Sequence, residues 1–181
     1  MKICKQCTQL FEPIDKRVVC HACRADELTK KALRNLGKQK REKQAKDKER
    51  IKTRPEWLKD AQVVFNAYIR ARDKGKPCIS CGKQIGYNEK HDAGHFYSGG
   101  GHSNLRFNEN NVHSQCVHCN QHLSANLIPY AISLPNRIGQ AAFDELHELA
   151  YIPKKWSIDE CKQIIEIYKQ KTKLLNENRD L

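Results

Sequence analysis

The side chains best suited to chemistry gather between Cys81 and Cys116 and just beyond. Five of the eight histidines lie between residues 95 and 122, and His91 with Asp92 stands directly before them. A nuclease needs a base that deprotonates water, a divalent ion on the scissile phosphate, and a group that holds the base in the correct tautomer. This segment offers imidazoles, a carboxylate and side-chain amides, and it therefore predicts metal-assisted phosphodiester hydrolysis.

Eight of the nine cysteines form four Cys-x-x-Cys pairs around this segment. Two thiolates separated by two residues can bind one ion across a tight turn, and two such turns complete a tetrahedral zinc site. A redox role is the alternative for a single pair, but four pairs without thioredoxin-like surroundings favour zinc. Chain order predicts two structural sites: Cys4, Cys7, Cys20 and Cys23 in one, and Cys78, Cys81, Cys116 and Cys119 in the other.

Closed zinc sites leave the histidines free for catalysis, because four thiolates fill the coordination of the ion. His21, inside the second pair, is an alternative ligand of the N-terminal site. The ninth cysteine, Cys161, lies among isoleucines at helical spacing. We expect it to be a core thiol.

The composition indicates a polyanionic partner. The chain has 181 residues, 39% of them hydrophobic, and a net charge of +12. Nucleic acid is the first expectation and an anionic membrane surface the second. No apolar run approaches the roughly 20 residues that span a bilayer, and the N-terminus carries no signal-peptide stretch. We therefore expect a cytoplasmic protein whose reduced thiols bind metal.

The other segments are expected to position this site within a small, metal-rich α+β fold. Residues 1–23 predict a zinc ribbon or knuckle, and residues 24–54 a basic helix or a disordered linker, with 13 Lys or Arg against five Asp or Glu. Residues 55–77 carry apolar side chains at a spacing of three to four, which predicts an amphipathic helix that packs on a module at 78–130. Further helices are expected within residues 131–181.

The basic segment is expected to bind DNA through its backbone. Lys38, Lys40, Arg41 and Lys43 would contact phosphates without reading the sequence of bases. The alternative is a solvated tether with no contact to DNA.

Two helices are expected after the module, at 136–149 and from Ser157 to about residue 175. Ser157 and Glu160 predict a capping box at the start of the second. Its apolar stripe, which includes Cys161 and Tyr168, either covers the module or pairs with a second copy of the chain.

The order of these motifs resembles a known family of nucleases. A Cys-x-x-Cys pair, a Gly-His before a loop, an Asn, and a second Cys-x-x-Cys followed by Asn is the HNH, or ββα-metal, pattern. The cysteine clamp is similar to that of the phage endonuclease VII branch. The stretches 92–95, 105–109 and 115–122, with the basic segment and the N-terminal cysteine pairs, resemble the NinG/Rap recombination endonucleases of lambdoid phages along nearly the whole chain.

The resemblance implies a zinc-clamped ββα-metal module around one catalytic Mg²⁺ or Mn²⁺ ion. In such a module His95 is the general base, and Asn111 matches the middle Asn, which orients the base or its loop. Asn120 takes the place of the metal ligand on the helix. We also expect Arg106 to contact DNA.

One position departs from the family pattern. Other members carry an acidic or His metal ligand directly before the base, whereas this chain has Gly94 there. Asp92 is the nearest carboxylate, and a bulge at Gly94 would bring it to the ion. His91, His113 and His122 are the alternative ligands.

The resemblance also implies a substrate, namely branched DNA such as Holliday junctions and displacement loops, cut during phage recombination in the bacterial host. Because such an enzyme must nick two strands, a two-fold homodimer is the expected assembly. Two other functions stay open: a zinc protein that only binds nucleic acid, and an assembly module that uses its terminal helices. The first of these gives no reason for Asp92, His95 and Asn120 to cluster around the cysteine clamp.

Overall fold

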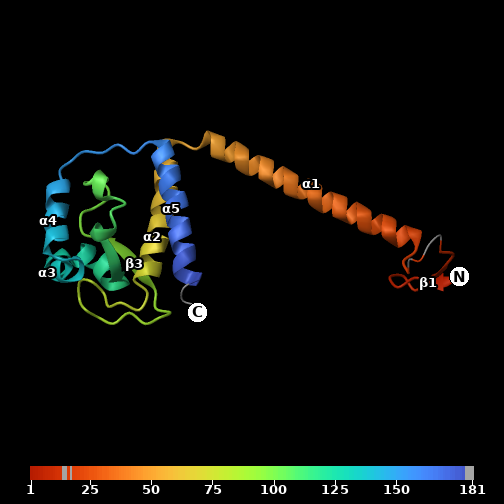
Figure 1. Ribbon diagram of the computed structural model, residues 1–181, viewed down its shortest axis with the longest axis horizontal. Helices are drawn as coiled ribbons and strands as arrows, with labels where there is room; N and C mark the ends of the chain where they lie inside the picture. The colour runs from red at the N-terminus through yellow and green to blue at the C-terminus, as the bar shows by residue number, and fades with distance from the viewer. Residues whose placement is uncertain (14–15, 17, 178–181) are drawn as a thin grey trace. The chain divides into compact units, whose positions relative to one another are not determined.

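A computed structural model describes residues 1–13, 16 and 18–177 of the chain (Figure 1). It is a small α+β structure, mostly helical, with two two-stranded sheets among the described residues. Within that part of the chain, no helix is both long and apolar enough to cross a membrane. The last residues of the expected C-terminal segment, 178–181, lie outside the described residues.

The chain divides into two compact units, Met1–Lys52 and Thr53–Leu181. The segments expected at 55–77, 78–130 and 131–181 all fall within the second unit. That unit therefore contains every residue that the sequence assigns to the chemistry.

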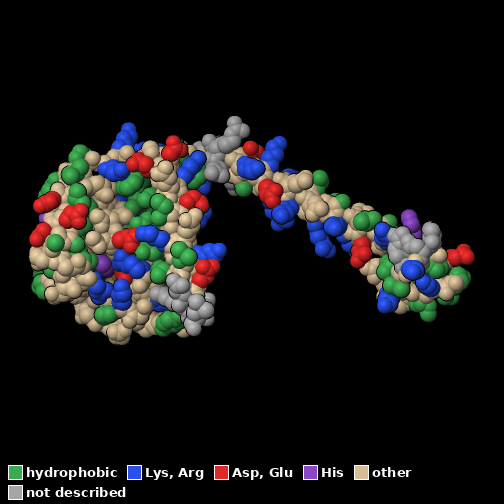
Figure 2. Space-filling model, viewed as in Figure 1, with side chains coloured by type: hydrophobic (Ala, Val, Ile, Leu, Met, Phe, Trp, Pro, Cys, Tyr) green, Lys and Arg blue, Asp and Glu red, His purple; other side chains and the backbone are tan. Residues whose placement is uncertain are grey.

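The first unit pairs a short hairpin with a long helix. Strands β1 (Lys2–Ile3) and β2 (Leu10–Phe11) are antiparallel, and helix α1 runs over His21–Ile51. Of the two states left open for the basic segment, the structure has the helix, because residues 24–52 lack proline and are mostly good helix formers. Its described side chains are nearly all exposed, and Figure 2 shows Lys and Arg side chains along it.

Helices α2 (Arg54–Arg72) and α5 (Ile158–Glu177) pack together and build the main core of the second unit. The predicted capping box at the start of α5 is confirmed: the Ser157 backbone N–H donates to Glu160 Oε2 (2.8 Å), and the Glu160 N–H donates to Ser157 Oγ (3.1 Å). These bonds satisfy N–H groups that have no partner inside the helix. A capping box at Thr53 starts α2 in the same way.

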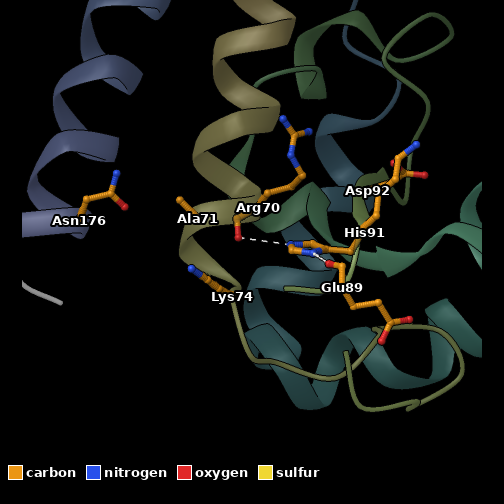
Figure 3. A pocket seen from close by; sticks show the side chains of 8 residues that line it. Arg70, Ala71, Lys74, Glu89, His91, Asp92 and Asn176 are labelled. Carbon is orange, nitrogen blue, oxygen red and sulfur yellow. Dashed lines mark hydrogen bonds between the residues drawn. The ribbon is translucent and has the colours of Figure 1, made fainter. Parts of the chain in front are cut away.

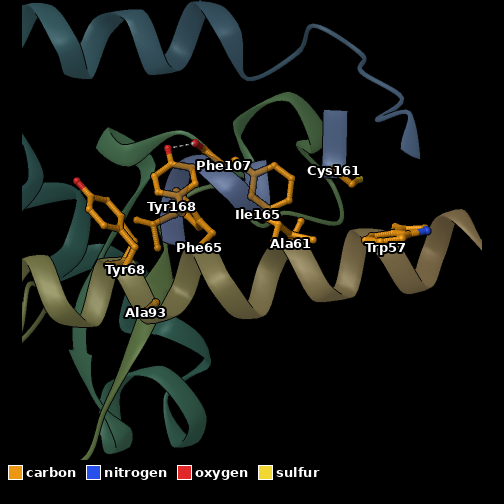
Figure 4. Close-up of a cluster of buried hydrophobic side chains, with 11 residues drawn as sticks. Trp57, Ala61, Phe65, Tyr68, Ala93, Phe107, Cys161, Ile165 and Tyr168 are labelled. Carbon is orange, nitrogen blue, oxygen red and sulfur yellow. Dashed lines mark hydrogen bonds between the residues drawn. The ribbon is translucent and has the colours of Figure 1, made fainter. Parts of the chain in front are cut away.

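The core between α2 and α5 is aromatic and also holds the sheet (Figure 4). The ring of Phe65 meets Tyr168 and Phe107 edge to face, at centroid distances of 4.8 and 5.6 Å. Cys161 is fully buried there, which confirms the expectation of a core thiol. The apolar stripe of α5 thus packs within its own chain, so of its two expected roles it takes the covering one.

The second sheet is the hairpin of β3 (His91–His95) and β4 (Val112–Cys116). The strands are antiparallel, with His91 opposite Cys116 and His95 opposite Val112. Ala93 and Val112 belong to the α2–α5 core, which fixes the hairpin against the helices. Short helical turns flank the hairpin: η1 (Ser103–Leu105) and η2 (Glu109–Asn111) before β4, then the π-helical turn η3 (His118–His122) and η4 (Ser124–Asn126) after it.

Two further helices, α3 (Leu127–Ile138) and α4 (Gln140–Leu149), form a second core with Ile79 and Leu105. The prediction of one helix over 136–149 was wrong at its start. Gly139 separates the two helices at φ +87°, a conformation that side-chain-bearing residues rarely adopt. The start of α3 was missed because prolines at 129 and 135 disfavour a helix, although the first lies in the first turn, where proline is tolerated.

Candidate active site

The four inner cysteines meet at one point, as their spacing predicts. The sulfur atoms of Cys78, Cys81, Cys116 and Cys119 lie within 4.8 Å of one another, and the Cys81 and Cys116 sulfurs are 3.9 Å apart. A tetrahedral ion with Zn–S bonds of about 2.3 Å separates its sulfurs by roughly 3.8 Å. This cluster is therefore compatible with zinc. It joins the turn before β3 to the end of β4 and to η3.

The N-terminal cysteines form a second cluster of the same kind. The sulfur atoms of Cys4, Cys7, Cys20 and Cys23 also lie within 4.8 Å of one another, and the Cys7 and Cys20 sulfurs are 3.7 Å apart. The backbone N–H of Cys20 donates to Cys4 Sγ at 3.3 Å, a bond that favours the thiolate form. Four thiols suffice for a closed site, so His21 is not needed as a ligand.

Asp92 and Asn120 come together from β3 and η3. Oδ2 of Asp92 accepts hydrogen bonds from Asn120 Nδ2 (3.0 Å) and from Gln121 Nε2 (2.8 Å). Carboxylate and amide oxygens are the ligands that Mg²⁺ and Mn²⁺ prefer. A half-turn of the Asn120 amide would present its oxygen beside the carboxylate. The donor set therefore fits a hard divalent cation, and Gln121 is a member of it that sequence reasoning missed.

His95 is half-buried, and its ring is held by a backbone oxygen. Its Nε2 lies 3.1 Å from the carbonyl oxygen of Arg106. Because a carbonyl can only accept, Nε2 carries the proton and Nδ1 keeps the free lone pair. Burial lowers the pKa of His95 below its ordinary value, against smaller opposing effects of the backbone at Arg106 and at Ala93. The lowered pKa favours the neutral ring, in which Nδ1 carries the lone pair that can accept a proton.

Asn111 pins the loop that presents this carbonyl. It is completely buried. Its Oδ1 accepts from the Tyr97 N–H (2.8 Å), while Nδ2 donates to the carbonyls of Tyr97 (2.9 Å) and Leu105 (3.0 Å). Leu105 directly precedes Arg106, so Asn111 fixes the loop and, through it, the ring of His95.

His95 and the Asp92–Asn120 pair are not in direct contact. In a strand, successive side chains point to opposite faces, so His95 and Asp92 leave β3 on different sides. Among the described residues, no hydrogen bond links His95 to either of the other two. A ligand that contacts both side chains would therefore have to reach around β3, whose outer edge pairs with no other described strand.

Two of the three histidines offered as alternative metal ligands are engaged elsewhere. His91 has its Nδ1 at 3.0 Å from the Glu89 carbonyl and its Nε2 at 3.4 Å from that of Arg70. His113 is buried, with Nε2 at the Asn110 carbonyl (3.1 Å). His122 is exposed on η3, with its ring 5.8 Å from that of His118. The geometry thus favours Asp92.

Gly94 makes room for another side chain rather than a bulge. The pairing of β3 with β4 runs without interruption from His91 to His95, so the expected bulge was wrong. A Cβ atom at Gly94 would lie only 1.9 Å from Oε1 of Gln115. Gln115 is fully buried and donates through Nε2 to Ser80 Oγ and to the Ala125 carbonyl, each at 2.5 Å. Glycine is required here because a neighbouring strand's side chain occupies the space.

An ion-pair network that sequence reasoning missed ties the end of α2 to β4. The Asp73 carboxylate is fully buried and accepts from Arg72, from Lys76 and from the Ser114 N–H (3.1 Å). Burial alone would raise the pKa of Asp73, but bonds from His113, Arg72 and Lys76 outweigh it and hold the pKa far below its usual range. Arg72 also donates to the carbonyls of Glu109 and Val112. No sequence motif marks this network.

A cationic hollow of about 560 Å³ adjoins Asp92 (Figure 3). Arg70 near the end of α2 and Lys74 just beyond it line the hollow, together with Lys90 and His91 at the start of β3. Glu89 also lines it, but its carboxylate pairs with Lys83 at 2.7 Å. The hollow therefore carries a surplus of positive charge next to the carboxylate, which suits a phosphate backbone.

The residues expected to contact DNA lie in different settings. Lys38, Lys40, Arg41 and Lys43 are exposed on α1, and Lys38 has an ion-pair partner in Glu42 at 3.9 Å. Arg106 is partly buried, with Nη1 donating to Gln62 Oε1 at 3.2 Å. Its backbone carbonyl has the visible role at the site. Contact of these five side chains with DNA stays a prediction.

Comparison with known proteins places the chain among phage proteins. A family model described as bacteriophage lambda NinG protein matches residues 1–178. The ninG protein of Escherichia phage lambda is 48% identical over 129 residues, which are 71% of this chain and 62% of that protein. That of Salmonella phage P22 is 46% identical, with the same coverage of both chains.

Another relative matches over nearly its whole length. The ninG protein of Enterobacteria phage H19B is 40% identical over 97% of this chain and 94% of its own. With the lambda and P22 proteins, by contrast, the match spans less than two thirds of the relative. No solved structure matches the chain. Because the family model covers nearly all residues and relatives exceed 40% identity, the chain belongs to the NinG family of lambdoid phage proteins.

Proposed function

We propose that this protein is a metal-dependent endonuclease of the HNH type that cuts branched DNA. The observation that carries the proposal is the meeting of Asp92 and Asn120, 28 residues apart in sequence, with Asp92 Oδ2 and Asn120 Nδ2 at 3.0 Å. Both lie on the segment that the inner cysteine cluster holds together. A protein that only binds nucleic acid has no need to hold two oxygen ligands and an imidazole within one short hairpin and the turn that follows it.

His95 acts as the general base of the proposed reaction. Its Nδ1 takes a proton from water, which then attacks the phosphorus atom, while Nε2–H stays bonded to the Arg106 carbonyl. Asn111 holds that carbonyl in place from inside the loop. The protein thus fixes the tautomer with backbone rather than with a carboxylate.

Asp92 and Asn120 would hold the divalent ion, Mg²⁺ or Mn²⁺. When bound, such an ion supplies charge stabilisation for the pentacovalent phosphate and for the leaving oxygen. Arg70, Lys74 and Lys90 would bind the adjoining phosphates of the same strand in the cationic hollow. The DNA strand would cross the outer edge of β3, between the face that presents the ion and the face that presents His95.

The substrate and the setting follow from the family resemblance and the charge. A net charge of +12 favours DNA, and the motif pattern resembles recombination endonucleases that act on Holliday junctions and displacement loops. We propose that the protein works as a homodimer in the cytoplasm of the bacterial host, because two strands must be nicked. Zinc would fill both cysteine clusters.

The test is a cleavage panel. The protein is incubated with a four-way junction, a displacement loop and a linear duplex of the same sequence, each with Mg²⁺, with Mn²⁺ and with EDTA. We expect metal-dependent nicks at the branch point. His95→Ala should bind the junction as wild type does but cut it at least a hundredfold more slowly, in line with the loss of a general base.

His118→Ala is the matched control, because His118 is an exposed histidine two residues from Asn120. It should keep wild-type rates. Cleavage that persists in EDTA, or His95→Ala cutting as fast as wild type, would remove the proposed mechanism. Tight junction binding by wild type without any cutting would favour the non-catalytic nucleic-acid-binding protein instead.

A further inference from the structure

An apolar cleft with a volume of about 610 Å³ opens beside His95, and it shares no lining residue with the cationic hollow. The residues that line it include the aromatic side chains of Phe96, Tyr97 and His102, and Leu127 and Ile128 at the start of α3. Among the described residues that line it, none is Lys, Arg, Asp or Glu. The cleft therefore suits a flat, weakly polar group rather than a phosphate.

The rim of this cleft exposes large apolar side chains to solvent. Ile128 is 79% exposed and Leu127 is 46% exposed. Both lie in the first turn of α3, which puts them at the mouth of the cleft rather than in the core. Apolar side chains placed this way beside bound DNA commonly act as wedges that separate stacked bases.

The cleft is preformed by a strained loop. Ser124, Ala125 and Asn126 are consecutive non-glycine residues in the left-handed region, at φ +47°, +70° and +44°. Such residues persist only where the surroundings hold them, and they gather at ligand-binding sites. Here Gln115 holds the loop by donating to the Ala125 carbonyl at 2.5 Å. Ser124 and Ala125 line the cleft itself, so the strain lies at its wall.

We propose that this cleft receives one unstacked nucleobase of the DNA strand whose phosphate lies at His95. The inference rests on the proposed function, because His95 forms part of the cleft and any occupant must be a neighbour of the scissile phosphate. The backbone then follows the cationic hollow at Asp92, while the base turns into the apolar cleft. A branch point offers bases that are unpaired and easily unstacked, so the cleft favours branched DNA over a continuous duplex.

The occupant is a base rather than a second protein chain, because the cleft is a pocket of ligand size beside a candidate catalytic residue. Stacking of a nucleobase on an aromatic ring depends little on which base it is, since every base has a π-face. The cleft therefore selects DNA structure rather than base sequence.

The first experiment removes the nucleobase of the junction and the Ile128 side chain of the protein, separately and together. Junctions carrying a single abasic nucleotide at each position around the cut are compared with the intact junction, in single-turnover cleavage with Mg²⁺. At one position, loss of the base should slow wild type about tenfold. Ile128→Ser should slow cleavage of the intact junction by a similar factor and show no further loss on the abasic one.

Ile132→Ser is the matched control. Ile132 lies one turn further along α3, is 69% exposed, and does not line the cleft. It should retain the wild-type sensitivity to the abasic position. Three outcomes would each overturn the inference without affecting the proposed nuclease activity. The wild-type protein could be insensitive to base loss at every position, or the effects of Ile128→Ser and base loss could multiply. The third outcome is that Ile132→Ser behaves like Ile128→Ser.

The second experiment separates base binding from catalysis. A junction that carries 5-iodouracil at the sensitive position is bound to the protein in EDTA and irradiated. If the wild-type protein shows no cleavage, 5-iodouracil is placed at each position around the branch point in turn. Crosslinks should map to the peptides that contain Phe96–Tyr97 or Leu127–Ile128. Crosslinks here from a protein that never cuts would keep the base pocket and remove the nuclease. Crosslinks only elsewhere, or none, would remove the pocket.

Discussion

At the scale of single residues, the state of His95 decides what the site can do. Its Nε2–H donates to the Arg106 carbonyl, so the proposed catalysis depends on an unprotonated Nδ1. Burial lowers its pKa below the ordinary value of 6.5. No carboxylate faces the ring among the groups that shift this pKa, and the nearby Arg106 charge acts in the same direction as burial.

The first prediction follows from that pKa. The rate kcat/KM for junction cleavage should rise with pH as His95 loses its proton, through an apparent pKa below 6.5, and stay flat above pH 7. The sign follows from a base that is active when neutral and whose folded pKa is depressed. The measurement is a pH–rate profile in saturating Mg²⁺ between pH 5 and 8. A rate that falls over this range would mean that a protonated group is needed instead.

The second prediction concerns Gly94. Gly94→Ala forces the Gln115 amide away from Ser80 and the Ala125 carbonyl, and it should lower the free energy of unfolding by about 1–3 kcal/mol, the range for an uncompensated buried polar group. In a Gln115→Ala background the same change should cost less than about 0.5 kcal/mol, because the obstructing side chain is gone. Urea unfolding of the four proteins measures this coupling.

Gly86→Ala serves as the control for that cycle. A Cβ at Gly86 meets nothing closer than Glu89 at 3.6 Å, which is ordinary contact. This variant should be near neutral. Equal costs of Gly94→Ala in both backgrounds would show that the Gln115 contact is not the reason for glycine.

At the scale of elements, the cysteine clusters decide which segments can meet. The inner cluster joins the turn before β3 to η3, and it therefore sets where Asn120 lies relative to Asp92. The Asp73–Arg72 network fixes the end of α2 to β4. Glu109 of η2, directly before β4, accepts hydrogen bonds from Tyr68 of α2 (2.8 Å) and Lys171 of α5 (2.5 Å), which ties η2 to both helices. The hairpin is thus anchored from three sides.

The third prediction is a zinc count. The purified chain should hold two Zn²⁺ ions, and Cys116→Ser and Cys4→Ser should each hold one. Because structural zinc contributes about 10–16 kcal/mol of binding free energy to folding, Cys116→Ser should also unfold the second unit and abolish cleavage. Atomic emission with thermal unfolding measures both effects. Cys161→Ser is the control and should keep two ions, since this thiol lies in the α2–α5 core. Two ions in either cluster variant would refute the assignment.

At the scale of the whole molecule, the proposed function is divided between two units. The second unit holds the candidate site, while the first carries a long exposed basic helix behind its own cysteine cluster. If the protein binds DNA as proposed, four exposed cations on one stretch of α1 would raise the affinity for any DNA without adding recognition of sequence. Selection of DNA structure would then be left to the second unit.

The fourth prediction tests that division. Replacing Lys38, Lys40, Arg41 and Lys43 by Gln should reduce the slope of log K against log salt by about 3–4 for duplex DNA, given a slope near 0.9 per phosphate contact. The preference for junction over duplex should not change. Fluorescence anisotropy titrations at several salt concentrations measure both. If the salt slope is unchanged by this replacement, this face of α1 does not contact DNA.

The sequence by itself determined the two cysteine quartets, the capping box of α5, the core thiol Cys161 and the family, because each depends on local spacing or on a pattern of residues along the chain. Only the tertiary structure decided that Gly94 admits Gln115 instead of forming a bulge, that the Arg106 carbonyl sets the tautomer of His95, and that Asp73 anchors β4. Those contacts join segments 11 to 41 residues apart. Side-chain volume and backbone oxygens leave no periodic trace, so they become visible only when distant segments are packed together.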